Sequence, residues 1–202
     1  MHIIRYPHPT LRHKSKPLRR VDAELKKVIR EMFEMMYEGR GIGLAANQVD
    51  LPYRLFVINL EADRANPEAE MVFINPVITE RKGMAEDQEG CLSFPEIFAP
   101  VRRPEKVVLS AFNLKGEEVS YEMNGLCARA VQHELDHLDG VLFIDRLSPS
   151  SRLSIREDLE ALELAFEGDR QRGLIPDDEA IAARLQELEA ARSYVPAPSA
   201  RV

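Results

Sequence analysis

Features that would classify a protein quickly are scarce in this sequence. It contains only two cysteines and no tryptophan, so the fold cannot depend on a disulfide framework. No stretch reaches the roughly 20 apolar residues that a membrane-spanning helix needs, and the first residues lead into no hydrophobic signal-peptide core. We therefore expect a cytoplasmic protein with no membrane contact.

An excess of positive charge is also missing. The chain has 27 Lys and Arg against 34 Asp and Glu, a formal net charge of −7. Because neutralising nucleic-acid phosphates needs a basic face, this argues against a general nucleic-acid binder, and we expect no DNA partner. The charge is uneven: residues 1–40 hold ten Lys and Arg against five acids, and residues 150–202 hold seven Arg against eleven acids. We interpret both segments as solvated surface.

Helical and strand patterns occur in separate parts of the chain. Apolar residues recur at steps of three and four from Leu25 to Met36, which predicts an amphipathic helix that begins after Asp22 and ends at Gly39. Short runs rich in β-branched and aromatic residues predict strands at 55–58, 71–74, 107–109 and 119–121. Further helices are expected from 124 or 125 to 139, from 150 to 167, and from 177 to 191.

Because strands and helices do not alternate regularly, the pattern predicts an α+β fold. We expect a mostly antiparallel sheet packed around a central helix, with helices at both ends of the chain. We divide the chain into a catalytic domain at residues 1–170 and a C-terminal extension at 171–202. The extension should comprise a helix and a disordered tail that contains Pro196 and Pro198.

The central helix carries the most specific pattern, an H-E-x-x-H motif at residues 133–137. At 100° per residue, His133 and His137 lie about 40° apart on one helix face and one turn apart along it, so both can bind one metal ion. Glu134 is adjacent to that face, close enough to act on a metal-activated water without being a ligand. The alternative is that these are ordinary surface residues. It is weakened because the other three of the five histidines all fall in the first 13 residues.

A catalytic metal usually takes three protein ligands, so one is still missing. Cys127 lies six positions before His133, about 120° around the helix and about 9 Å along it, which is a poor position for a shared metal. We expect it to pack as a small hydrophobe with Val131 and Leu138. Cys91 follows Gly90 and can approach from another element as a thiolate ligand. Taken on its own, Cys91 would be interpreted as an inert buried cysteine.

Three segments together resemble the signature motifs of the peptide deformylase family. They are Gly41-Ile42-Gly43-Leu44-Ala45-Ala46-Asn47-Gln48, Glu89-Gly90-Cys91-Leu92-Ser93 and Gln132-His133-Glu134-Leu135-Asp136-His137. Their order and separation match, as do Pro9-Thr10-Leu11-Arg12 and Gly140-Val141-Leu142-Phe143, so the resemblance covers roughly residues 1–165.

The resemblance implies removal of the N-formyl group from the initiator methionine of nascent proteins, with release of formate. Cys91, His133 and His137 would hold one divalent metal, with Fe(II) expected and zinc, nickel or cobalt able to replace it. Glu134 would be the general base and acid during attack by a metal-activated water. Stabilisation of the developing oxyanion would come from Gln48 and the Leu92 backbone N–H.

The remaining implied roles concern the substrate and the support of the cysteine loop. Residues expected beside the substrate are Ile42, Gly43, Gly90 and Leu126, with Ile42 and Leu126 as candidates for the methionine slot; core packing explains these two equally well. Glu89 is expected to pair with Arg103 and brace the loop, although an ordinary surface charge explains Glu89 nearly as well.

Three questions stay open at this stage. An H-E-x-x-H metallopeptidase would have the same helix, but its third ligand is usually histidine or glutamate. A non-enzymatic interaction protein with a structural metal would not need Glu134 and Gln48. A transient contact with the ribosome is conceivable, although the segment after residue 150 is acidic, whereas some bacterial relatives have a basic C-terminal helix there. Phe98 also departs from the family, where many members carry a polar or basic residue.

Overall fold

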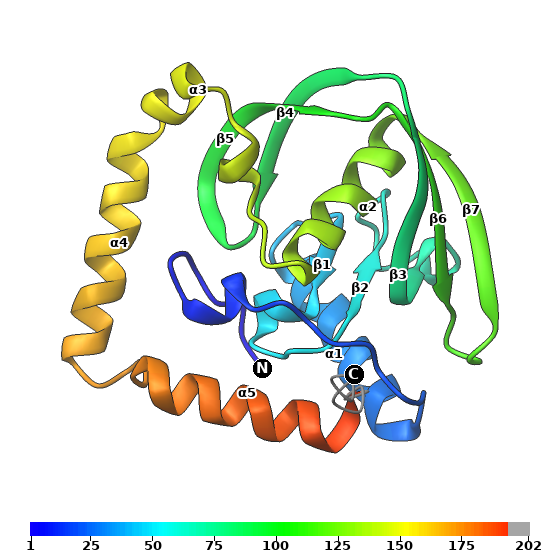
Figure 1. Ribbon diagram of the computed structural model, residues 1–202, viewed down its shortest axis with the longest axis horizontal. Coiled ribbons are helices and arrows are strands. Elements are labelled where there is room, and N and C mark those ends of the chain that lie inside the picture. The colour runs from blue at the N-terminus through cyan, green and yellow to red at the C-terminus, as the bar shows by residue number, and fades with distance from the viewer. Residues whose placement is uncertain (194–202) are drawn as a thin grey trace, which may run out of the picture.

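The computed structural model describes residues 1–193 (Figure 1). Its helices are α1 (Ala23–Glu38), α2 (Gly125–Leu138), α3 (Pro149–Ser154), α4 (Arg156–Gln171) and α5 (Asp178–Arg192). Short 3-10 helices are η1 (Pro9–Arg12), η2 (Ala46–Val49), η3 (Pro67–Ala69) and η4 (Phe143–Arg146). The strands are β1 (Gly43–Ala45), β2 (Leu55–Ile58), β3 (Met71–Lys82), β4 (Ala85–Cys91), β5 (Phe94–Arg103), β6 (Lys106–Phe112) and β7 (Glu118–Asn124).

The strands form two antiparallel sheets. Five strands pair in the order β1-β2-β3-β6-β7, and β4 pairs with β5 in a separate two-stranded sheet. In Figure 1, α2 lies in the centre, with the five-stranded sheet on one side and the β4–β5 hairpin arching over it. The expected α+β class with antiparallel sheets is confirmed.

The alternation of side chains in β2 explains why helices cover both faces of the sheet. Phe56 and Ile58 belong to the hydrophobic cluster that includes α2, whereas Leu55 and Val57 belong to the cluster that includes α1. Since successive strand residues point to opposite faces, one fully buried strand supports a helix on each side. Every residue from Ala128 to Leu138 is buried, so α2 is an interior helix and polar side chains on it need internal partners.

The helix predictions agree well with the structure. Asp22 caps α1, because its carboxylate accepts a hydrogen bond from the Leu25 N–H at 2.9 Å. The predicted helix at 150–167 is instead two helices, α3 and α4, joined at Ile155, whose φ of −109° and ψ of 11° depart from helical values. None of the helices in the described residues is long and apolar enough to cross a membrane. The predicted disordered tail with Pro196 and Pro198 lies outside the described residues.

The last helix lies against the N-terminal segment. Figure 1 shows α5 running beneath that segment, after α4 has turned away from the β4–β5 hairpin. Ile181 and Leu185 of α5 are buried, and Glu189, which is 2% exposed, pairs with both His13 and Lys16. The division of the chain at residue 170 remains a prediction.

Candidate metal and catalytic site

His133, His137 and Cys91 converge at the centre of the molecule. The two histidines project from one face of α2, and Cys91 is the last residue of β4. Their ligand atoms all lie within 4.8 Å of one another, and Cys91 Sγ is 3.3 Å from His137 Nε2. Cys127 is half-buried and packs against the cluster that contains Val131 and Leu138. The geometry therefore favours Cys91 over Cys127 as the third donor.

Glu89 orients the His133 ring through a hydrogen bond. Its carboxylate accepts a hydrogen bond from His133 Nδ1 at 3.0 Å, which leaves Nε2 facing Cys91. Burial raises the pKa of Glu89, but the hydrogen bonds from His133 and Arg103 outweigh it and bring the pKa to about 2. Glu89 is thus an ionised carboxylate that fixes the tautomer and direction of the histidine ring, as the carboxylate partners of metal-ligating histidines commonly do.

Arg103 connects Glu89 to α2. It donates to both carboxylate oxygens of Glu89, at 2.6 and 2.8 Å, and to Asp136 at 2.7 Å. Arg129 adds a further bond to Glu89 at 2.6 Å, and Arg146 pairs with Asp136. The ion pair expected between Glu89 and Arg103 is present, and it is part of a larger buried network. This network fixes β4, β5 and α2 relative to one another.

Gln48 reaches the cysteine from η2. Its side-chain Nε2 donates to Cys91 Sγ and to Ser93 Oγ, both at 3.3 Å, while its Oε1 accepts from the Ala45 N–H at 2.9 Å. The bond between Oε1 and the Ala45 N–H fixes which end of the Gln48 amide points to Cys91. Gln48 is 1% exposed, so its N–H donors lie in a site shielded from bulk water, where they interact most strongly with charge.

Leu92 brings the first and second motifs together. Its side chain lies against Gly39 and Gly41, where an added Cβ would come within 2.9 and 2.7 Å of it. A side chain at either position would therefore force Leu92 to move. The backbone that follows Cys91 is thereby held close to the segment that leads into β1.

Glu134 points from α2 toward β1. An added Cβ on Gly43 would lie 2.5 Å from Glu134 Oε1, so the carboxylate lies directly against the strand backbone. Its other oxygen, Oε2, is buried without a hydrogen-bond partner among the described residues. Burial raises the pKa of Glu134 to about 7. Such a group can both accept and release a proton near neutral pH.

The donors suit a metal ion of borderline softness. One thiolate and two imidazoles form the kind of set that binds zinc or iron. Burial holds the pKa of His137 well below its ordinary value, which favours the neutral imidazole that a ligand must be. Burial also lowers the pKa of His133, but its hydrogen bonds with Cys91 and Glu89 outweigh this and raise the pKa to about 10, so His133 would release a proton on binding a metal. Two buried polar atoms near the site, His137 Nδ1 and Glu134 Oε2, have no protein partner among the described residues. The unpartnered Oε2 leaves room for a hydrogen bond to a water at the metal position.

Comparisons with known proteins show the family of this chain. The family model described as polypeptide deformylase matches residues 1–153. The chain belongs to this family. A peptide deformylase of Rhodopirellula baltica is 46% identical over 188 residues, covering 93% of each chain. One of Neisseria meningitidis is 48% identical over 160 residues, covering 79% of this chain and 94% of the relative.

A solved structure shows the same fold. Peptide deformylase 1B of Arabidopsis thaliana, in complex with an inhibitor, superposes with a TM-score of 0.80 at 42% identity, covering 88% of this chain and 97% of that one. The expected enzyme class, a peptide deformylase, is confirmed.

The residues predicted beside the substrate lie at different depths. Gly43 is buried in β1, Ile42 and Gly90 are half-buried, and Leu126 near the start of α2 is 55% exposed. Phe98 covers Gly90: an added Cβ there would lie 2.4 Å from its ring, and the ring is itself 65% exposed. The first two motifs thus meet near Glu134, whereas Leu126 and Phe98 lie at the surface.

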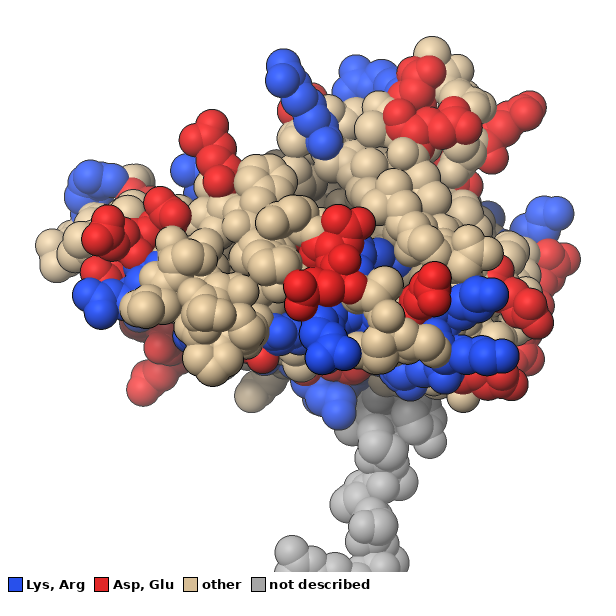
Figure 2. Space-filling model, turned by 90° about the horizontal axis from the view of Figure 1, so that it is seen from above, with Lys and Arg blue, Asp and Glu red and all other residues tan. Residues whose placement is uncertain are grey.

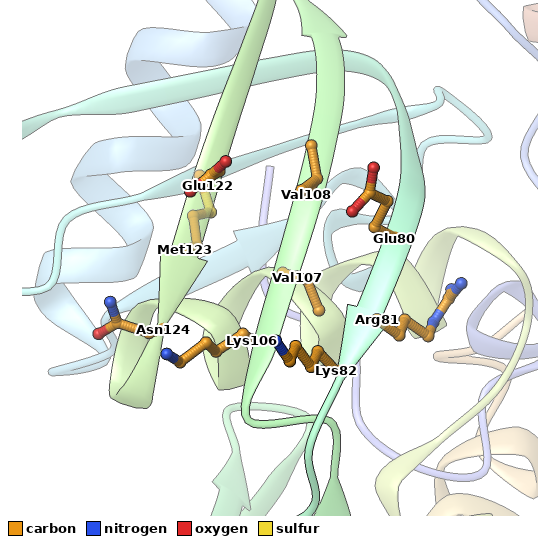
Figure 3. A pocket seen from close by; sticks show the side chains of 9 residues that line it. All are labelled: Glu80, Arg81, Lys82, Lys106, Val107, Val108, Glu122, Met123 and Asn124. Atoms are coloured by element: carbon orange, nitrogen blue, oxygen red, sulfur yellow. The ribbon is translucent and has the colours of Figure 1, made fainter.

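A separate hollow lies away from these residues. Figure 3 shows it over the ends of β3, β6 and β7, with a volume of about 360 Å³. Its lining includes Lys82, Lys106 and Asn124, which are cross-strand neighbours, and Glu80 and Glu122. The metal-ligating side chains do not line it, so it is not the candidate catalytic site.

Four residues around the site were not predicted from the sequence. Arg129, Asp136 and Arg146 belong to the buried network, and Ser93 shares the Gln48 amide with Cys91. The helical spacing contained a signal for the first two, because residues 129, 133 and 136 repeat at i, i+4 and i+7 and share one helix face. No comparable spacing identifies Ser93, whose position depends on the β4–β5 turn.

Proposed function

We propose that this chain removes the N-formyl group from formyl-methionine at the start of newly made proteins, releasing formate and a free amine. The observation that carries the proposal is the position of Glu134. It lies in the turn of α2 that holds His133 and His137, with one carboxylate oxygen against β1 and the other unpartnered. A purely structural metal site would have no use for such a carboxylate.

Cys91, His133 and His137 are the residues that would hold the metal. When bound, a divalent metal polarises the formyl carbonyl and lowers the pKa of water at the site. We propose Fe(II) as the native metal, with zinc, nickel or cobalt able to occupy the same donors. The thiolate supports this choice, because it favours soft or borderline metals over magnesium or calcium.

Glu134 is proposed to move protons during the reaction. Its free oxygen would accept a proton from the attacking water and then deliver one to the departing amine nitrogen. Gly43 supports this role because the absence of a side chain there lets the carboxylate lie against β1. The same close approach would allow the substrate backbone to pass beside β1.

Gln48 and the Leu92 N–H are proposed to stabilise the oxygen of the formyl group as it becomes negatively charged. The Gln48 amide supports this role because its N–H donors already point at Cys91, the ligand beside the reacting carbon. A preorganised donor of this kind is worth roughly 3 kcal/mol in the transition state. Glu89 and Arg103 would act indirectly by holding His133 and the cysteine strand.

Substrate selection is proposed to depend on the residues around β1 and the β4–β5 turn. Gly43 and Gly90 would lie beside the peptide backbone, and Ile42 and Leu126 would contact the methionine side chain. The tight packing of Leu92 on Gly39 and Gly41 is consistent with a site that admits a small acyl group. Larger acyl groups would be excluded by the lack of space around the carbonyl.

We place the reaction in the cytoplasm, because a thiolate metal ligand needs reducing surroundings. The partners would be nascent formyl-methionine peptides. On the face shown in Figure 2, basic side chains are interspersed with acidic ones. A transient ribosome contact therefore has no supporting basic surface on that face.

The proposal is tested by measuring formate release from a formyl-Met-Ala-Ser peptide. Protein prepared without oxygen and loaded with iron or nickel should release formate, and should leave internal bonds of an unformylated peptide intact. A metallopeptidase would do the reverse. Glu134→Ala is the matched variant: it should keep the metal, because Glu134 is not a ligand, and lose at least about 100-fold in kcat. Metal-loaded wild-type protein that releases no formate would refute the function.

A further inference from the structure

Helix α5 is firmly attached to the N-terminal segment. The buried Glu189 accepts hydrogen bonds from Lys16 Nζ at 2.7 Å and from the His13 ring at 2.8 Å. At the end of the helix, Arg192 pairs with Asp22 and Glu24 at the start of α1. These contacts give α5 a fixed position from which its other side chains can act on neighbouring elements.

Arg184, in the middle of α5, reaches the residue that ends η2. Its guanidinium donates to the backbone oxygen of Asp50 at 3.0 Å and forms an ion pair with the Asp50 carboxylate. The two residues are 134 positions apart in the sequence. Arg184 therefore links the C-terminal helix directly to the segment that carries Gln48.

Asp50 adopts a left-handed backbone conformation. Its φ is 63°, in the region that glycine adopts readily and that asparagine and aspartate adopt occasionally. It closes η2, because its N–H donates to the Asn47 oxygen at 3.1 Å. Thr10 Oγ1 donates to its carboxylate at 2.5 Å, on the oxygen that Arg184 does not use. Asp50 is thus held from two sides, by Thr10 and by Arg184.

Gln48 belongs to η2 and lies two residues before Asp50, the C-cap of that short helix. Its side-chain bonds to Cys91 and Ser93 are long, at 3.3 Å each, so small movements of η2 would change the direction of the amide. Its backbone oxygen accepts from the Ile4 N–H at 2.8 Å, which is a second tether on the opposite side. The orientation of Gln48 hence depends on two sets of contacts, one on its own backbone oxygen and one on Asp50.

We infer that Arg184 is a positioning residue for the deformylase reaction: through Asp50 it holds η2 so that the Gln48 amide faces the reacting carbonyl. This inference rests on the proposed function and goes beyond it, because it gives a role to a helix that lies outside the residues matched by the family model. Arg184 itself does not contact Cys91, His133 or His137. Its effect passes through the Asp50 backbone.

The primary test is Arg184→Gln, compared with wild type in the same metal form under steady-state conditions. Because transition-state stabilisation depends on the direction of the donor, kcat should fall about 5- to 10-fold while KM stays within about twofold. Arg184→Lys, which retains the charge, should recover part of the lost kcat. Asp50→Asn provides a second variant that removes the ion pair while tolerating the left-handed conformation, and it should reproduce the loss.

Arg192→Gln is the matched control on the same helix. It breaks two ion pairs of α5, but with α1 and not with η2. It should lower the melting temperature at least as much as Arg184→Gln while leaving kcat within about twofold of wild type. An equal fall of kcat in both variants would show that α5 acts only through general stability, and would overturn the inference.

A double-mutant cycle with Gln48→Ala decides whether the effect passes through Gln48. In the Gln48→Ala background, Arg184→Gln should lower kcat by less than about twofold, because the donor it positions is gone. Additive losses, or an unchanged kcat in Arg184→Gln alone, would reject the inference. Neither result affects the proposed function, which fails only if the wild-type protein releases no formate.

Discussion

At the scale of single residues, Arg103 supports the site although it is not one of the three candidate metal ligands. It is 2% exposed and satisfies two carboxylates, one on β4 and one on α2. Burial lowers the pKa of Arg103, but the hydrogen bond and charge of Glu89 outweigh this and keep it raised. Glu89 and Arg103 are therefore both held in their charged forms, and each charge stabilises the other inside the protein.

Replacing Arg103 with methionine should destabilise the protein strongly. Glu89 and Asp136 would each lose a buried partner, and breaking a buried pair from one side costs about 3–5 kcal/mol. Urea unfolding followed by circular dichroism measures this loss. Arg64→Met removes an exposed pair with Glu34, whose side chains are 56% and 55% exposed, and should cost less than about 1 kcal/mol. Similar losses in both variants would contradict the importance of the network.

Gly43 offers a second residue-level prediction. A Cβ there would lie 2.5 Å from Glu134 Oε1, so Gly43→Ala must displace the carboxylate. Because a shift of about 1 Å in a catalytic group can cost about 100-fold, kcat should fall by at least about tenfold while the bound metal per chain is unchanged. Gly168→Ala in α4 is the control, since an added Cβ there meets nothing within 4 Å. An active Gly43→Ala variant would show that Glu134 need not lie against β1.

At the scale of elements, the start of α1 is linked to the end of α5. Asp22 accepts hydrogen bonds from the Leu25 N–H at 2.9 Å and from Arg192 of α5 at 3.0 Å. The Leu25 bond, followed by the Arg192 bond, lowers the pKa of Asp22 to about 2. Since this lies below the value of about 3.9 expected for an unfolded chain, ionised Asp22 contributes stability above pH 4.

Asp22→Asn should therefore change how stability depends on pH. Asparagine can still cap the helix but cannot pair with Arg192 as a charge. The stability from ionised Asp22 is lost as pH falls from about 4 to about 2, so the difference in melting temperature between wild type and variant should be largest near neutral pH and vanish near pH 2. The comparison uses metal-free protein, because acid also protonates the ligands. A difference that stays constant over this range would contradict the assignment.

The elements that the sequence predicted are those with a strong local pattern. The helices α1 and α5 and the metal-carrying α2 have recognisable caps or spacing, and β2 is a short continuous apolar run. The hairpin β4–β5 was missed for a physical reason: residues 86–89 are all polar, and β5 contains Pro95 and Pro100. Its stability depends on non-local contacts that no local window contains. These are the Arg103 network and a hydrophobic cluster that joins Phe94 and Val101 of β5 to Phe143.

The candidate site could likewise be predicted only where the sequence contains a local pattern. Spacing on one helix predicted a role for His133, Glu134 and His137 and argued against Cys127, while the choice of Cys91 as the third donor came from the resemblance to a family. The contacts of Gln48 were not predictable in detail, because they depend on η2, Ser93 and the N-terminal segment meeting in space. Residues that act through contacts between distant parts of the chain leave no periodic signal in the sequence.

At the scale of the whole molecule, the three candidate metal ligands lie on different sheets and helices of the fold. Cys91 ends the β4–β5 sheet, whereas His133 and His137 belong to the helix packed on the five-stranded sheet. Cys91 and His137 are 46 positions apart. A metal bound by all three would therefore cross-link the hairpin to the body of the protein, and this bond would exist only in the folded state.

Removing the metal should consequently lower the stability of the whole protein. A ligand that binds only the folded state at 1,000 times its Kd adds about 4 kcal/mol. Chelation should lower the melting temperature by several degrees, and amide hydrogen exchange should accelerate most in β4 and β5 and least in α1, which contributes no ligand. Cys91→Ala should show little further change on chelation, because its site is already incomplete. If chelated wild-type protein, shown by elemental analysis to lack metal, melts at the same temperature as the loaded form, the three residues do not connect these elements through a metal.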